Sequence, residues 1–123
     1  MDQNKLISRI YPGQMARPTP EVKMGPQGQS LIVAFPWGST TAVRQACQNM
    51  LDYFTTAQVD REATSPFAKM PGISPIANLM RNSVLLGNET LFQKQNFENY
   101  ATGCELLMLT VENHELTYVS IGQ

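Results

Sequence analysis

The side chains of this chain that are best suited to catalysis are few and dispersed. His114 is the only histidine, and it lies between Glu112 and Glu115 in a segment expected to be a hairpin turn. No Ser–His–acid set can be assembled around it. The acidic residues form no D-x-D or H-x-H pair of the kind that binds a metal. The spacing therefore indicates neither nucleophilic nor metal-dependent chemistry, and we expect His114 at the surface.

The two cysteines, Cys47 and Cys104, match no metal-ligand spacing. Cys47 falls on the apolar stripe of an expected helix, where a buried thiol behaves as a small hydrophobic residue. We expect a structural role for both cysteines, although the sequence leaves a disulfide open. No metal and no cofactor are predicted.

The bulk composition is that of one globular domain, or part of one, with 123 residues and a net charge of −1. The scattered Lys and Arg residues provide no basic patch, so we expect neither nucleic acid nor membrane as a partner. Charged residues make up 15% of the chain, below the ~25% of typical soluble domains. Either an association surface or a Gln/Asn/Thr-rich polar surface explains this. The N-terminus lacks a signal-peptide apolar region and no run reaches ~18 apolar residues, so a cytoplasmic location is expected.

A strand–turn–helix unit is the clearest element of the chain. The apolar run Leu31–Phe35 predicts a strand covered on both faces, within 29–35. Pro36 is expected to end the strand, Gly38 to turn the backbone, and Ser39 or Thr40 to cap a helix at 41–57. One apolar stripe follows helical spacing in that helix: Val43, Ala46, Cys47, Met50, Leu51 and Phe54.

A second helix and a hairpin follow. Ser74-Pro75 predicts a helix start, and the helix should run to about residue 95 with one apolar face, although Gly87-Asn88 could bend or divide it. Strands at 104–111 and 115–121 should form an antiparallel hairpin. The fold class is therefore α+β, an antiparallel sheet with two helices on one face. We divide the chain into an irregular segment at 1–28, where 19–24 could add an edge strand, and a half domain at 29–123.

Two blocks of sequence carry a resemblance to a known family. The first is the run Val33-Ala-Phe-Pro-Trp-Gly-Ser39, which leads into a helix. The second joins Gly103-Cys-Glu-Leu106 to a return strand ending in Gly122-Gln123. In this order the two blocks resemble the N-terminal half of the metal-dependent protein phosphatases (PPM, type 2C), with V-A-D-G-x-G-G, a G-[TC]-[TE]-L strand and a final G-D. The resemblance covers roughly residues 20–123. It implies half of a sandwich of two antiparallel sheets flanked by helices.

The metal-binding positions of that family are replaced in this chain. The bridging Asp of the family corresponds to Phe35, the glycine after it to Pro36, and the acid of the return strand to Gln123. Only Glu21 corresponds to an acid on the family's earlier strand. An aromatic ring cannot coordinate Mg²⁺ or Mn²⁺, which require oxygen ligands. The resemblance therefore implies a phosphatase-like domain without its metal centre.

The sequence thus predicts a non-catalytic, phosphatase 2C-like binding or regulatory module that acts through protein contacts. We expect a homodimer, because half a sandwich leaves a sheet face and a strand edge to be covered. The expected interaction surface is Trp37, Tyr118, Val119 and Ile121, although Phe35 and Trp37 could instead plug the helix–sheet junction. Two alternatives remain: a segment of an active metal-dependent Ser/Thr phosphatase, and an unrelated small α+β interaction domain.

Overall fold

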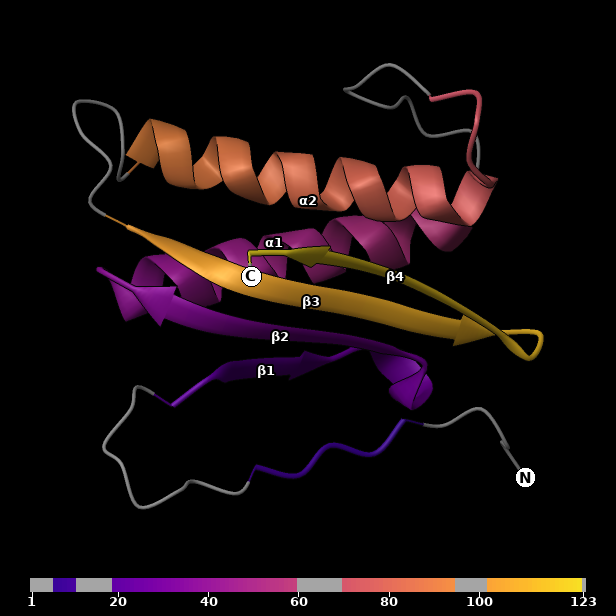
Figure 1. Cartoon of the computed structure of the whole chain (residues 1–123), viewed down its shortest axis with the longest axis horizontal. Helices are drawn as coiled ribbons and strands as arrows, with labels where there is room; N and C mark the ends of the chain where they lie inside the picture. The colour runs from indigo at the N-terminus through magenta and orange to yellow at the C-terminus, as the bar shows by residue number, and fades with distance from the viewer. Residues whose placement is uncertain (1–5, 11–18, 60–69, 95–101, 123) are drawn as a thin grey trace.

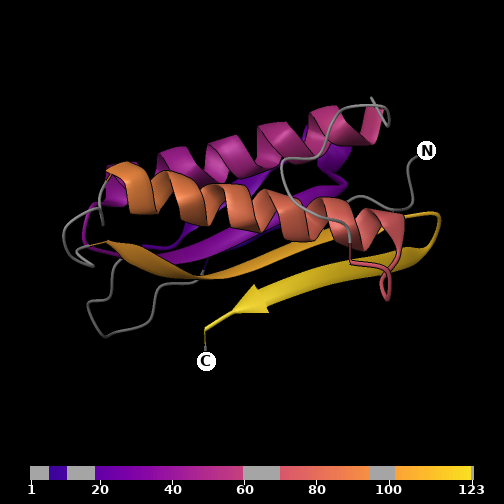
Figure 2. The same cartoon turned by 90° about the horizontal axis from the view of Figure 1, so that it is seen from above.

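The chain folds into two layers, a four-stranded sheet and a pair of helices. The computed structural model describes residues 6–10, 19–59, 70–94 and 102–122. The elements follow in the order β1 (Glu21–Met24), η1 (Pro26–Gly28), β2 (Ser30–Trp37), α1 (Thr40–Val59), α2 (Pro75–Lys94), β3 (Gly103–Glu112) and β4 (Glu115–Ile121). Figures 1 and 2 show both helices on the same side of the sheet. The α+β class is confirmed, and none of the helices in the described ranges is long and apolar enough to cross a membrane.

The sheet has the order β1-β2-β3-β4, and every neighbouring pair is antiparallel. The central pair joins strands far apart in sequence, with Ser30 opposite Thr110. These two buried hydroxyls hydrogen-bond each other at 3.1 Å, and Thr110 Oγ1 also donates to the Gln29 carbonyl. A shift of register would leave these polar groups without partners inside the core, so they help to hold β2 and β3 in place.

Pro36 does not end β2, contrary to the sequence-based expectation. The strand continues through it to Trp37, and Pro36 is paired with Cys104 of β3. β1 reaches only as far as Ala34, so Pro36 lies where β2 has a neighbour on one side alone. A residue without an N–H is tolerated at such a position. The turn comes at Gly38, which has a φ of 81°.

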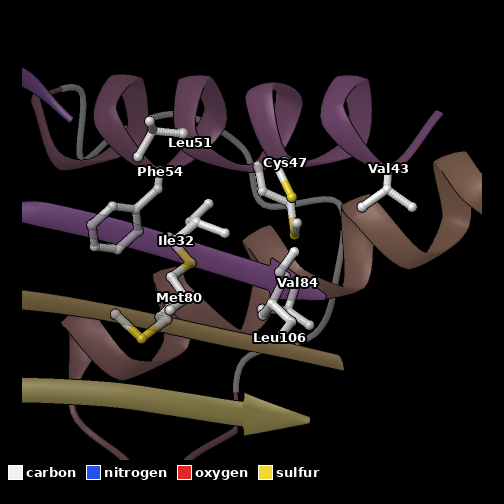
Figure 3. Packing of buried hydrophobic residues seen from close by; sticks show 11 residues of the cluster. Ile32, Val43, Cys47, Leu51, Phe54, Met80, Val84 and Leu106 are labelled. Carbon is white, nitrogen blue, oxygen red and sulfur yellow. The ribbon is translucent and has the colours of Figure 1, made fainter. Parts of the chain in front are cut away.

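Helix α1 begins and packs as its sequence predicts. The amide of Ala42 donates to Ser39 Oγ at 3.2 Å, which caps the N-terminus. All six residues of the predicted stripe are buried. Figure 3 shows Val43, Cys47 and Phe54 pointing from α1 toward the sheet.

Helix α2 begins at Pro75, where Ser74 Oγ accepts a hydrogen bond from the amide of Ala77. The helix is continuous to Lys94, so Gly87 neither breaks nor divides it. A Cβ built on Gly87 would lie 2.5 Å from Met50 Sδ. The glycine is therefore explained by the close approach of α2 to α1.

The C-terminal hairpin has the expected place but a tighter turn. Glu112 pairs with Glu115, which leaves only Asn113 and His114 between the strands. Both residues have positive φ, 53° and 65°, as a type I′ turn requires. His114 is exposed in this turn, as predicted.

The hydrophobic core lies between the helices and one face of the sheet. α1 contacts β1 and β2, and α2 contacts β4 and α1. The core cluster takes Ile32, Ala34, Leu106 and Met108 from the central strands, and Figure 3 shows Ile32 and Leu106 beneath α1 near Met80 and Val84 of α2. We call this side of the sheet the helix face and the opposite side the outer face.

Candidate interaction surface

The outer face of the sheet is apolar almost throughout. Strand residues alternate between the two faces, so the residues next to the buried ones in sequence lie outward. The register then defines the outer face as Val22 and Met24 of β1; Leu31, Val33, Phe35 and Trp37 of β2; Gly103, Glu105, Leu107, Leu109 and Val111 of β3; and Leu116, Tyr118 and Ser120 of β4. Among these outer-face residues of the four strands, Glu105 is the only one with a charged side chain.

Several of these apolar side chains remain accessible to solvent. Tyr118 is 65% exposed, Leu116 59%, and Phe35 52%. Met24 and Leu107 are also exposed, whereas Leu31, Val33, Leu109 and Val111 are half-buried. Single exposed apolar residues are ordinary, whereas large contiguous apolar patches occur at protein or membrane interaction sites and at ligand-binding grooves. The helices cannot cover the outer face, because they occupy the other side of the sheet (Figure 2).

The expectation for the strand 29–35 is wrong in one respect. Its apolar run predicted burial on both faces, but only the helix face is fully covered, and Phe35 is exposed on the outer face. An uninterrupted apolar run cannot by itself tell a covered face from an uncovered one. Phe35 therefore does not plug the helix–sheet junction.

The residues of the predicted interaction surface do not all lie on one face of the sheet. That surface was Trp37, Tyr118, Val119 and Ile121. Tyr118 lies on the outer face opposite Leu109. Val119 and Ile121 are opposite Met108 and Leu106, on the helix face, and Val119 packs against the core. The pleat separates neighbouring residues of a strand in this way, which the sequence grouping had ignored. The outer-face residues Leu107, Leu109 and Leu116 were missed, although the register of the predicted hairpin could have placed them beside Tyr118.

Trp37 lies at the end of β2 against a glycine of the neighbouring strand. Trp37 is paired with Gly103, and a Cβ on that glycine would lie 2.3 Å from Trp37 Cζ2. The indole therefore occupies the space that a side chain at position 103 would fill. Half of Trp37 remains exposed, at 52%. A hydrogen bond also joins the segments next to these two strand ends: the Ser39 amide donates to Thr102 Oγ1 at 3.1 Å.

The structure describes three of the four residues that the sequence resemblance compares with a metal site. Glu21 accepts two hydrogen bonds from Arg44, at 3.0 Å and 3.2 Å, which tie β1 to α1. The hydrogen bond and the charge of Glu21 both raise the pKa of the Arg44 guanidinium. Phe35 is exposed on the outer face, and Pro36 is buried on the helix face. Gln123 lies outside the described residues.

A cavity of about 250 Å³ opens between the helices and the end of β3. Its lining is mostly apolar and contains both cysteines, together with Met50, Trp37 and Gly87. Both thiols are unbonded. Burial, and to a smaller extent Cys104, raises the pKa of the Cys47 thiol to about 12, and burial raises the pKa of Cys104 as well. Both thiols are therefore neutral near pH 7, which disfavours a nucleophilic role.

Comparison with known proteins does not identify the chain. No protein-family model matches it, and no curated protein matches it with significance. In the described ranges, His, Cys, Asp and Glu form no group of three or more that could hold a metal ion.

Proposed function

We propose that this protein is a non-catalytic binding or regulatory module that acts through protein–protein contacts of its outer face. The observation that carries the proposal is the exposure of Phe35, Leu116 and Tyr118 on a face whose described strand residues include a single charge. Covering such a face removes apolar surface from water, which contributes roughly 25 cal/mol per Å². We propose a protein as the partner, a homodimer as the assembly and the cytoplasm as its location, with neither nucleic acid nor membrane involved.

We further propose that the domain is a degenerate half of a phosphatase 2C-like sandwich. The order of β2, α1, α2 and the hairpin of β3 and β4 supports this, because it is the order that the resemblance implies. The pairing of Glu21 with Arg44 supports loss of the metal site, since a bound cation would have to displace the guanidinium. The exposed Phe35 in place of an acid supports it too.

A pair of measurements tests this function. Calorimetric titration with Mn²⁺ should detect no micromolar site, and p-nitrophenyl phosphate should not be hydrolysed. Turnover that a chelator abolishes would instead favour the active phosphatase. In gel filtration, the chain should elute above its 13.7 kDa mass, alone or in a native extract. Tyr118→Lys should lower that apparent mass, whereas the matched change Val59→Lys on α1 should not. Elution as a monomer in both settings would contradict a binding module.

A further inference from the structure

We infer that the partner of the outer face is a second copy of this chain, packed sheet against sheet rather than strand edge to strand edge. The inference rests on the proposed function and specifies which surface and which partner it uses. Two sheets that pack face to face lie about 10 Å apart, and their side chains interdigitate. Two identical faces related by a twofold axis form a self-complementary interface.

The size of the apolar patch fits a stable dimer. Phe35 and Tyr118 are each more than half exposed. Because a whole aromatic residue buries ~150–250 Å², the two together offer roughly 200 Å². With the exposed and half-buried aliphatic residues of the outer face, the apolar area reaches roughly 500 Å² per copy. A standard interface buries about 800 Å² per partner, of which somewhat more than half is apolar. One outer face therefore supplies the apolar area that a dimer needs.

The charge distribution favours a second copy over a charged partner. A partner rich in Lys or Arg would have to desolvate those cations against an apolar face on which the strands, as described, offer only the carboxylate of Glu105. A second outer face presents the same nearly uncharged surface. Glu105 is opposite Phe35, near the end of β3, and so it lies at the rim, where a carboxylate stays hydrated.

Face packing would bury the outward side chains of the inner strands, whereas edge pairing would leave them in solvent. Val33 lies on β2 between β1 and β3, and Leu107 lies on β3 between β2 and β4. Neighbouring strands are ~4.8 Å apart, so a copy joined to either edge strand would lie about 10 Å or more from both residues. A lysine at Val33 or at Leu107 would be buried without a partner in the face dimer, yet it would remain in solvent if the copies joined at an edge.

The experiment is sedimentation equilibrium of the full chain at micromolar concentrations. The unaltered protein should be a dimer, and Val33→Lys or Leu107→Lys should each weaken it about 30-fold or more, as loss of a central contact does. The controls Val59→Lys and Phe92→Lys replace exposed apolar residues of the helices and should leave the dimer unchanged. Circular dichroism verifies that each variant folds. A dimer that tolerates both outer-face lysines would overturn the inference.

A second measurement needs no substitution. In methyl-labelled unaltered protein, a soluble paramagnetic probe should broaden the Val59 methyl signals, while those of Leu107 and Leu116 stay sharp at dimer concentrations. A monomer whose Leu107 and Leu116 methyls are broadened would refute self-association but leave the face available to another protein. A monomer in which these methyls are protected would show that the face is covered within the chain, and the proposed function would then fail as well.

Discussion

Substitution of Gly87 by Ala tests whether a close contact between the helices determines this residue. In an exposed helix interior, Gly→Ala stabilises by roughly 1 kcal/mol. Here the new Cβ would lie 2.5 Å from Met50 Sδ and 2.6 Å from Met50 Cγ, well inside the ~3.5–4.0 Å of ordinary contact. Overpacking of this kind costs about 1–3 kcal/mol. Because the neighbouring cavity gives the Met50 side chain some room to move, we expect a cost in the lower half of that range. The net change in the free energy of unfolding should lie between zero and about 1 kcal/mol of destabilisation.

The same substitution should change sign once the methionine is removed. Met50→Ala alone should lower the free energy of unfolding by about 2–5 kcal/mol, because Met50 is buried in the core. In that background Gly87→Ala meets no sulfur atom and recovers the full helical preference, about 1 kcal/mol of stabilisation. The double-mutant cycle should therefore give a coupling of roughly 1–2 kcal/mol between the two positions.

Equilibrium urea unfolding of the four proteins in the cycle provides the measurement. Gly72→Ala is the matched control, because nothing lies within 4 Å of a Cβ built on Gly72. That control should show no coupling to Met50. If Gly87→Ala stabilised the unaltered protein and the Met50→Ala variant equally, close packing would not be the reason for the glycine.

Two further predictions concern the cavity and its rim. Gly103→Ala should displace the indole of Trp37, the only tryptophan, and so increase acrylamide quenching of its fluorescence; unchanged quenching would show that the ring does not rest on position 103. Burial raises the pKa of Cys47 from 9.0 to about 12, so its contribution to stability is complete below pH 9.0 and is lost as pH rises toward 12. Between pH 8 and ~10.5 the free energy of unfolding of the unaltered protein should fall by about 2 kcal/mol more than that of Cys47→Ala, at 1.36 kcal/mol per pKa unit. Parallel losses in the two proteins would contradict that shift.

The helices were predictable because their signals are local. Ser39 and Ser74 cap the helices as their sequence positions indicate, and the stripe that contains Val43 and Phe54 is buried as its spacing requires. Each of these features depends on residues within a few turns of one helix. The role of Gly87 depends on Met50 in another helix, so local rules suggested a bend where the structure has a close contact.

The outer face could be predicted only in part, because it depends on register and on which side the helices occupy. Tyr118 was identified from its strand, but its neighbours Val119 and Ile121 lie on the helix face. The position of Pro36 inside β2 depends on β1 being short. The face on which each residue lies and the pairing of Pro36 both depend on the assembled sheet, so they cannot be predicted from the sequence of one strand.

The apolar pattern of β2 and β3 is itself an argument that the outer face is covered when the protein functions. An antiparallel sheet with one face in water normally alternates apolar and polar residues. β2 instead places Leu31, Val33 and Phe35 outward, and β3 places Leu107, Leu109 and Val111 outward. Outward polar residues would leave the packing between the sheet and the helices unchanged, so the core on the helix face does not require the outward apolar ones. A local pattern that contradicts the isolated structure occurs mainly at functional sites. The outward apolar residues of β2 and β3, which face solvent in the isolated chain, therefore support the proposal that this surface functions in association.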